Sequence, residues 1–309
     1  PGIAFVYVID FQTSAIKSRI EFASDHENEN MDYRTITSAL SLDGTKGAMT
    51  VAETQIRLLS FDRSGVIASG SLFRIEDSQS VSSLCFSADA TRLFVSHHRS
   101  DIWEFNLNSG KLLHPPILAN ARSFSIMSSG SGDWMVAASL DHTVKLWDTD
   151  RPGSLVTLNG HREEVWSVAV SSDSRWIATG GQNGEIVVWR EDAGRTNESF
   201  DADSISNKES IVASSGSFFV PSLDGKLREY NLMSRNHSTT PVSGYPVDAS
   251  PDSGSLTLAA KVSRTGRNTS ILLETWKPGS WTKEASRAFN IHANLSYLVP
   301  DHRHGFPVV

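Results

Sequence analysis

Cysteine and long hydrophobic runs are scarce in this sequence. Cys85 is the single cysteine among 309 residues, which excludes an internal disulfide and a structural zinc site built on cysteines. A chain without disulfides suits a reducing compartment, so we expect a cytoplasmic location, with the nucleus as the alternative. No apolar run approaches the ~18–20 residues that a membrane span needs, and we expect no membrane association.

Positive charge is also in short supply. The chain has 28 Lys and Arg against 35 Asp and Glu, a formal net charge of −7. Because nucleic-acid recognition needs a basic face, this balance argues against a nucleic-acid partner. The chain begins at Pro1, with neither an initiator Met nor a signal-like segment, which predicts a piece of a larger multidomain protein.

The motifs of common enzymes are missing as well. No Gly-rich phosphate loop follows a strand, and neither a Gly-x-Ser-x-Gly elbow nor a His-Glu-x-x-His motif occurs. Cys85 lies in the alternating run Val81–Phe86, which indicates a buried, inert thiol rather than a nucleophile. We therefore predict a non-enzymatic protein with no catalytic residue and no cofactor.

Two histidine pairs have spacings that invite a metal-site interpretation. His97 and His98 are adjacent, so on a strand their side chains would point to opposite faces. His302 and His304 have the parity of one face, but no third ligand lies nearby in the sequence. We predict no metal site.

The sequence does contain an internal repeat. The segments Trp134–Asp148 and Trp176–Arg190 align, each with a β-rich run, a polar turn and a second β-rich run that ends in Trp. The two final tryptophans, Trp147 and Trp189, are 42 residues apart. Weaker copies place other apolar residues at the same position, at spacings of 41–50: Ile9, Leu59, Phe105, Tyr230 and Trp276.

Each repeat holds four short strand candidates separated by turn residues. Such a period of about 40–45 residues favours a β-propeller, and we predict an all-β, seven-bladed propeller of four-stranded antiparallel sheets. It forms a single domain over 1–309, with full sheets at about 36–73, 81–118, 123–159, 165–200, 211–243 and 245–289. Strands from 3–24 and 291–309 share the closing blade, which leaves no sheet edge exposed.

The pairs Gly160-His161 and Trp147-Asp148 resemble the signature of the WD40-repeat (WD-repeat) family of β-propellers. The resemblance comprises one strong repeat and several degenerate ones, strongest over about 120–230. The pattern also resembles the C-terminal propellers of fungal NACHT-type signalling proteins. The family resemblance implies a scaffold for protein–protein interaction.

The resemblance also implies a buried network inside one blade. In the family, a His, a Ser or Thr, a turn Asp and a Trp are joined by hydrogen bonds. The matching residues here are His161, Thr179, Asn183 and Trp189. Since Asn183 replaces the usual Asp, we expect the charged member of the network to be lost. The preceding repeat keeps Asp141 but has Ala137 at the Ser/Thr position and no His in its entry loop.

Loops at one face of a propeller would carry the partner site. The candidates mix Arg, His and Glu with an occasional aromatic residue, which suits a protein or peptide. They are Tyr33, His98, Arg99, Arg122, Arg162, Glu163, Glu164, Trp166, Arg264 and Arg267. The alternative is a small-ligand or glycan-binding, lectin-like propeller. A lectin repeats one binding loop per blade, whereas the loops that begin at Gln182, His98 and Arg264 differ, which favours the scaffold.

Aspartates recur in the turns expected at the opposite face. We interpret them as turn formers, because an Asp side chain caps the backbone of a tight turn. They are Asp43, Asp89, Asp133, Asp173 and Asp252. Trp103 and Trp281 have no obvious packing partner in the sequence and are candidates for exposure.

Overall fold

The fold consists of β-strands. The computed structural model describes residues 3–10, 15–23, 37–52, 55–62, 67–68, 72–75, 80–97, 101–118, 122–190, 197–201, 211–214, 216–221, 226–234, 236–243, 245–249, 256–265, 268–291, 299–301 and 306–308. These residues contain no helix, and hence none that is long and apolar enough to cross a membrane. The predicted all-β class is confirmed.

Antiparallel sheets follow one another along the chain. Sheet 1 holds β3 (Ser38–Leu40), β4 (Lys46–Ala52), β5 (Gln55–Phe61), β6 (Ile67–Ala68) and β7 (Leu72–Arg74). Sheet 2 holds β8 (Val81–Phe86), β9 (Arg92–His97), β10 (Asp101–Asn106) and β11 (Ile117–Leu118). Sheet 3 holds β12 (Ser123–Ser128), β13 (Trp134–Ser139), β14 (Thr143–Asp148) and β15 (Arg151–Asn159).

Three further sheets continue this pattern. Sheet 4 holds β16 (Val165–Val170), β17 (Trp176–Gly181), β18 (Glu185–Arg190) and β19 (Asn197–Asp201). Sheet 5 holds β20 (Val212–Ala213), β21 (Ser217–Pro221), β22 (Lys226–Asn231) and β23 (Asn236–Ser243). Sheet 6 holds β24 (Tyr245–Ala249), β25 (Leu256–Thr265), β26 (Asn268–Lys277) and β27 (Thr282–Ile291).

The last sheet combines strands from the two ends of the described chain. Its order is β2 (Ala15–Ala23), β1 (Ile3–Asp10), β29 (Phe306–Val308) and β28 (Val299–Asp301). The contact between the two ends is antiparallel and pairs Val8 with Val308. Sheets 2 to 6 and this closing sheet have four strands each, as predicted, whereas two short strands, β6 and β7, both pair with β5 in sheet 1.

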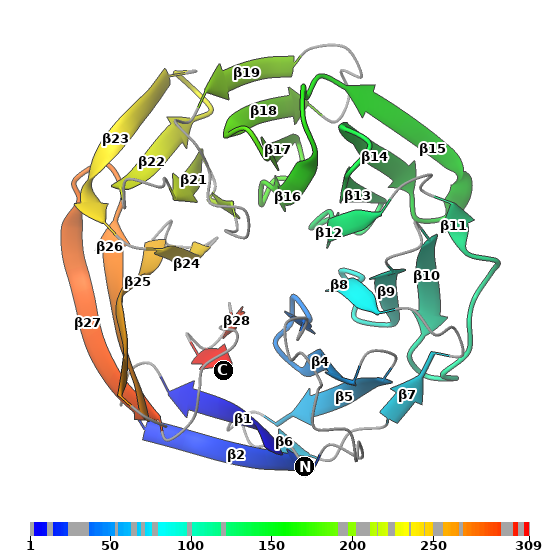
Figure 1. Ribbon diagram of the computed structural model, residues 1–309, viewed down its shortest axis with the longest axis horizontal. Coiled ribbons are helices and arrows are strands. Elements are labelled where there is room, and N and C mark those ends of the chain that lie inside the picture. The colour runs from blue at the N-terminus through cyan, green and yellow to red at the C-terminus, as the bar shows by residue number, and fades with distance from the viewer. Residues whose placement is uncertain are drawn as a thin grey trace.

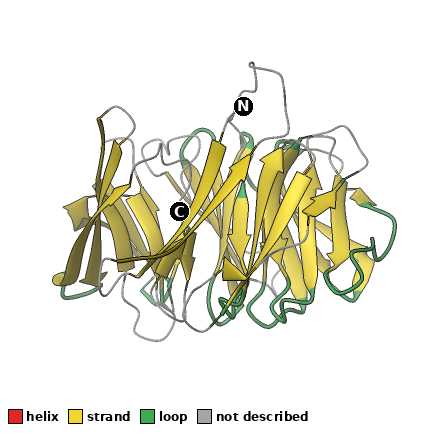
Figure 2. Ribbon diagram, turned by 90° about the horizontal axis from the view of Figure 1, so that it is seen from below, coloured by secondary structure: helices red, strands yellow, loops and turns green. Residues whose placement is uncertain are grey.

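The sheets stand in a ring around a common centre. In Figure 1, β8, β12 and β16 lie innermost, while β15, β19, β23 and β27 form the rim. Seen from the side in Figure 2, the ring is a disc whose connections emerge at two opposite faces. This arrangement is that of a β-propeller, in which each sheet packs between two neighbours.

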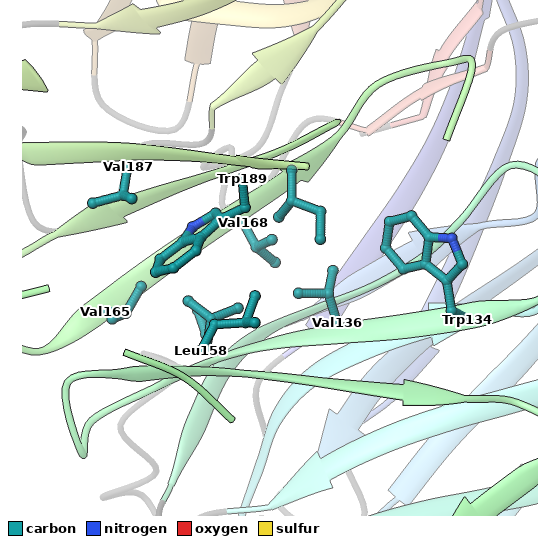
Figure 3. Close-up of a cluster of buried hydrophobic side chains, with 10 residues drawn as sticks. Trp134, Val136, Leu158, Val165, Val168, Val187 and Trp189 are labelled. Carbon is teal, nitrogen blue, oxygen red and sulfur yellow. The ribbon is translucent and has the colours of Figure 1, made fainter. Parts of the chain in front are cut away.

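The hydrophobic core lies between neighbouring sheets. Between sheets 3 and 4, aromatic and β-branched side chains from both sheets interdigitate (Figure 3). Trp134, Val136 and Leu158 come from sheet 3, and Val165, Val168, Val187 and Trp189 come from sheet 4. Alternation along each strand sends side chains to both faces of a sheet, which explains why buried residues run almost continuously along β13 and β18.

Hydroxyl side chains join the inner edges of two sheets. Ser82 Oγ donates to the carbonyl of Ser123 at 2.6 Å, and the Ile126 N–H donates to Ser83 Oγ at 3.3 Å. An innermost strand has one edge without a neighbouring strand, so its backbone groups need other partners. Serines on β8 therefore satisfy part of the inner edge of β12.

Aspartates cap three of the predicted turns. In the turns at Asp43, Asp89 and Asp173, a serine two residues earlier donates its hydroxyl to the carboxylate, at 2.6, 2.5 and 2.6 Å. In the turn of sheet 3, Ser131 takes that place beside Ser129, and Asp133 lies two residues further on. Asp252 lies outside the described residues.

The two tryptophans that were candidates for exposure are packing residues. Trp103 is half-buried against the cluster between sheets 1 and 2. Trp281 lies in the turn between β26 and β27, yet its ring meets Phe219 of sheet 5 edge-on, with 6.1 Å between ring centroids. Sequence spacing did not indicate the contact of Trp281, because Phe219 comes from a different sheet, whereas Trp103 also contacts His97 and Phe105 of its own sheet.

Candidate functional site

A buried network joins three of the four residues that the family resemblance singles out. Thr179 lies on β17, Trp189 on β18 and His161 in the loop between β15 and β16. The Trp189 Nε1–H donates to Thr179 Oγ1 at 2.8 Å, and the same oxygen lies 2.7 Å from His161 Nε2. The network therefore fastens the loop that precedes β16 to the centre of sheet 4.

A buried carboxylate lies beside the network: it belongs to Glu185, the first residue of β18. Its carboxylate is 2% exposed, and Oε2 lies 3.6 Å from His161 Nδ1. Asn183 instead bonds its own turn, where its Oδ1 accepts the Glu185 N–H at 3.1 Å. His161 Nδ1 has no hydrogen-bond partner among the described residues, so Glu185 lies beside the hydrogen-bonded network, at more than hydrogen-bond distance from the ring.

Strand spacing did not point to Glu185, because Asn183 lies in the turn before β18 and Glu185 is the first residue of the strand. Glu185 also contacts the loop beyond the histidine, because Oε2 accepts the Arg162 N–H at 3.1 Å and Oε1 lies 3.8 Å from Arg162 Nε.

Burial sets the charge of His161. It lowers the pKa of the imidazole from 6.5 to about 4, while the Glu185 carboxylate acts in the opposite direction. The ring is therefore neutral at pH 7, which suits a structural member of a hydrogen-bonded network.

Gly181 makes room for this arrangement. A Cβ atom at this position would lie 2.9 Å from His161 Nδ1 and 3.0 Å from Asn183 Oδ1. The first distance is shorter than real Cβ contacts and the second is tight, so a side chain at this position would displace the His161 ring. Sequence reasoning did not identify this glycine.

The corresponding network in sheet 3 is incomplete, in line with the sequence. Trp147 Nε1 is buried and has no hydrogen-bond partner among the described residues, and Ala137 occupies the position of Thr179. Asp141 accepts the Thr143 N–H at 3.1 Å and lies 2.9 Å from Lys145 Nζ. The Asp141 carboxylate thus makes its contacts within its own turn and the strand that follows.

Four candidates for partner contact lie near the start of β16. Arg162 has 74% of its side chain exposed, and Glu163 is exposed, whereas Glu164 and Trp166 are half-buried. Arg122 is half-buried just before β12, and burial lowers its pKa. The structure therefore presents Arg162 and Glu163 most fully to solvent.

The remaining candidates are placed differently. Tyr33, His98, Arg99 and Arg267 lie outside the described residues. Arg264 was expected in a loop, but it belongs to β25, where its backbone pairs with Thr269. The hairpin between β25 and β26 is shorter than the sequence suggested, because β-pairing continues to Thr265 and Asn268.

Backbone hydrogen bonds place the candidate loops beside one another. The Gln182 N–H donates to the Glu164 carbonyl at 2.8 Å, and the Leu140 N–H donates to the Arg122 carbonyl at 3.0 Å. Thr143 pairs with Asn159, which brings the turn of sheet 3 next to the loop at 160–164. We call this surface the loop face: Arg122, residues 140–142, 160–164 and 182–184.

No nucleophile or metal-binding cluster stands out in the part of the chain that the structure describes. Burial raises the pKa of the Cys85 thiol to about 12, which keeps it protonated and unreactive. No group of three or more His, Cys, Asp or Glu side chains with metal-binding spacing occurs among the described residues. His97 is buried against Trp103, and His98, His302 and His304 lie outside the described ranges.

Comparison with known proteins identifies two repeats and several relatives. Residues 120–148 and 153–190 match the family described as "WD domain, G-beta repeat". The chain is 29% identical over 114 residues to "COMPASS component SWD3" of Saccharomyces cerevisiae, a match that covers 37% of this chain and 36% of the relative. It is 34% identical over 115 residues to "Denticleless protein homolog A" of Xenopus laevis, which covers 35% of this chain and 16% of the relative.

A third relative is "Eukaryotic translation initiation factor 3 subunit I" of Scheffersomyces stipitis, 28% identical over 80 residues, or 26% of this chain and 23% of the relative. The chain thus spans about a third or less of the length of these relatives.

Proposed function

Since residues 120–148 and 153–190 are WD40 repeats, the chain is a WD40-repeat protein, and we propose that it is a non-enzymatic scaffold whose loop face binds a protein or peptide. WD40-repeat proteins generally act as interaction scaffolds. The names of two relatives describe one as a component and the other as a subunit of an assembly. We further propose a cytoplasmic or nuclear location and no nucleic-acid partner.

The observation that carries this proposal is a pair of exposed charged side chains on a loop whose backbone is held by hydrogen bonds. Arg162 and Glu163 extend from a loop that is held from below by His161 and Glu185. A surface whose backbone is already ordered loses little entropy when it binds. Exposed Arg beside Glu suits a partner with complementary charges, and Trp166 adds half-buried aromatic area at the edge.

The lectin-like alternative is less well supported. A sugar-binding propeller repeats one loop, whereas equivalent turns here carry Asp141-His142 in sheet 3 and Asn183-Gly184 in sheet 4. These side chains differ in charge and size, so they form no repeated binding site.

The test is affinity capture with a charge-reversed variant and a matched control. Arg162→Glu changes the loop face, and Arg175→Glu makes the same change on an exposed residue in the turn between β16 and β17, at the opposite face. We expect the captured partner to bind wild type and Arg175→Glu equally, and Arg162→Glu at least 10-fold more weakly, measured with the purified partner. Equal binding by all three proteins would contradict the use of the loop face.

A further inference from the structure

A buried carboxylate contacts the exposed loop at more than one point. We propose that Glu185 is the positioning residue of the loop face: it fixes the backbone that presents Arg162 and Glu163, without touching the partner itself. This inference rests on the proposed function, because it assigns a role in partner binding. Its evidence is the bond from the Arg162 N–H to Oε2, at 3.1 Å, and the buried position of the carboxylate.

The chemistry of a buried charge explains why these contacts belong together. A carboxylate that is withdrawn from water needs hydrogen-bond donors and opposite charge nearby. Glu185 has the Arg162 N–H at 3.1 Å and the Arg162 guanidinium Nε at 3.8 Å. Charge-assisted bonds of this kind are about twice as strong as neutral ones. One side chain thus ties both the backbone and the exposed guanidinium of Arg162 to β18.

Sheet 3 shows what happens when the carboxylate lies in the turn instead. Asp141 occupies the position that corresponds to Asn183, and it bonds Thr143 and Lys145 within its own turn and strand. In sheet 4 the carboxylate belongs to Glu185, two residues after Asn183, and it accepts a hydrogen bond from the backbone of the loop. A carboxylate in the turn therefore stabilises its own hairpin, whereas a carboxylate at the start of the strand stabilises the neighbouring loop.

The histidine provides a second, independent readout. Because the Glu185 carboxylate raises the pKa of His161 against the effect of burial, removing its charge lowers that pKa further. A residue that served only to fill space would leave the titration of His161 unchanged when it is replaced by a side chain of the same size.

The experiment compares Glu185→Gln with Glu104→Gln in the folded protein. Glu104 is equally buried, at 2% exposure, but lies in sheet 2, where it pairs with Arg92 and His114. In Glu185→Gln we expect the Arg162 amide to lose at least 10-fold in hydrogen-exchange protection, the pKa of His161 to fall, and affinity for the captured partner to drop about 10-fold. In Glu104→Gln all three stay at their wild-type values.

Moving the carboxylate to the turn separates its contact with the His161 ring from its contact with the Arg162 backbone. The double variant Asn183→Asp/Glu185→Gln moves the charge to the turn, near the His161 ring. We expect it to restore the pKa of His161 but neither the protection of the Arg162 amide nor the affinity. Should Glu185→Gln not fold, Glu185→Asp, which keeps the charge but is one methylene shorter, tests the same loss of amide protection.

The outcomes for this proposal and for the proposed function differ. Unchanged protection of the Arg162 amide in Glu185→Gln would overturn the positioning role, even if Arg162→Glu abolishes partner binding. Lost protection combined with unchanged partner binding in Arg162→Glu would overturn the proposed function of the loop face.

Discussion

At the scale of single residues, two tryptophans in equivalent positions differ in whether their indole N–H has a hydrogen-bond acceptor. Trp189 and Trp147 end their β-runs in the same register, each opposite the second residue of the preceding strand. The indole of Trp189 has the Thr179 hydroxyl as an acceptor, whereas the indole of Trp147 faces a strand with Ala137 in that place. A buried N–H without a partner costs ~1–3 kcal/mol, so an acceptor for Trp147 in sheet 3 would stabilise the protein.

Replacing Ala137 by Ser is predicted to stabilise the protein. The added hydroxyl provides an acceptor for Trp147 Nε1, as Thr179 does for Trp189, and we expect a gain of about 1 kcal/mol in the free energy of unfolding. Urea denaturation measures this value. Ala138→Ser is the matched control, because it adds the same buried hydroxyl on the other face of β13 and is expected to destabilise. Equal losses in the two variants would contradict the prediction.

The neutral state of His161 predicts a dependence of stability on pH. The pKa is about 4 in the folded chain and 6.5 as the unperturbed value, so the unfolded chain binds more protons between these values. The contribution is fully present above pH 6.5 and is lost as the pH falls towards 4, by about 3 kcal/mol in total. Urea denaturation at pH 7.5 and 4.5 tests this. In His161→Asn the loss of stability between these two pH values should be smaller by ~2.5 kcal/mol, and identical losses would contradict the prediction.

At the scale of elements, turns repeat with the same backbone shape but different residues. The turns between the second and third strands of sheets 3 and 4 place His142 at φ +66° and Gly184 at φ +83°. In both, the preceding side chain, Asp141 or Asn183, accepts the N–H two residues further on. This left-handed conformation suits glycine and strains a residue that has a Cβ atom.

Exchanging the residue types at these turns is predicted to shift stability in opposite directions. His142→Gly relieves strain at an exposed position and is expected to add roughly 0.5–1 kcal/mol, after the greater freedom of glycine in the unfolded chain is included. Gly184→Ala introduces the strain and is expected to cost ~1–2 kcal/mol. Thermal unfolding of the two variants provides the comparison. A destabilised His142→Gly would show that the imidazole makes a contact that stabilises the turn.

At the scale of the whole molecule, the ring is held by hydrophobic layers between sheets and by one sheet that unites distant parts of the chain. The pairing of Val8 with Val308 joins β1 to β29 (Figure 1). In the closing sheet, β29 covers the edge of β1 that would otherwise be free to pair with another chain. The closing sheet is therefore where the ring is most sensitive to deletion.

Deletion of residues 292–309 is predicted to open the ring. It removes β28 and β29, leaves β1 with β2 as its remaining strand partner, and exposes a strand edge. We expect a lower melting temperature and concentration-dependent association, seen by size-exclusion chromatography. A truncated chain that stays monomeric and melts at the full-length temperature would show that the closing sheet does not hold the ring.

The sequence by itself determined the repeat, the all-β class and most of one network. Spacing along the chain is enough for the repeat and the strands, and the family resemblance added His161, Thr179 and Trp189, whose contacts lie within a single sheet and its entry loop. Tertiary structure decided the features that cross between sheets or depend on the reach of a side chain. A carboxylate lies beside His161 although Asn183 replaces the usual Asp, because Glu185 reaches that place, and Trp281 packs on a ring from the neighbouring sheet. Such distances follow from how sheets stack in space, which the spacing of residues in one repeat does not encode.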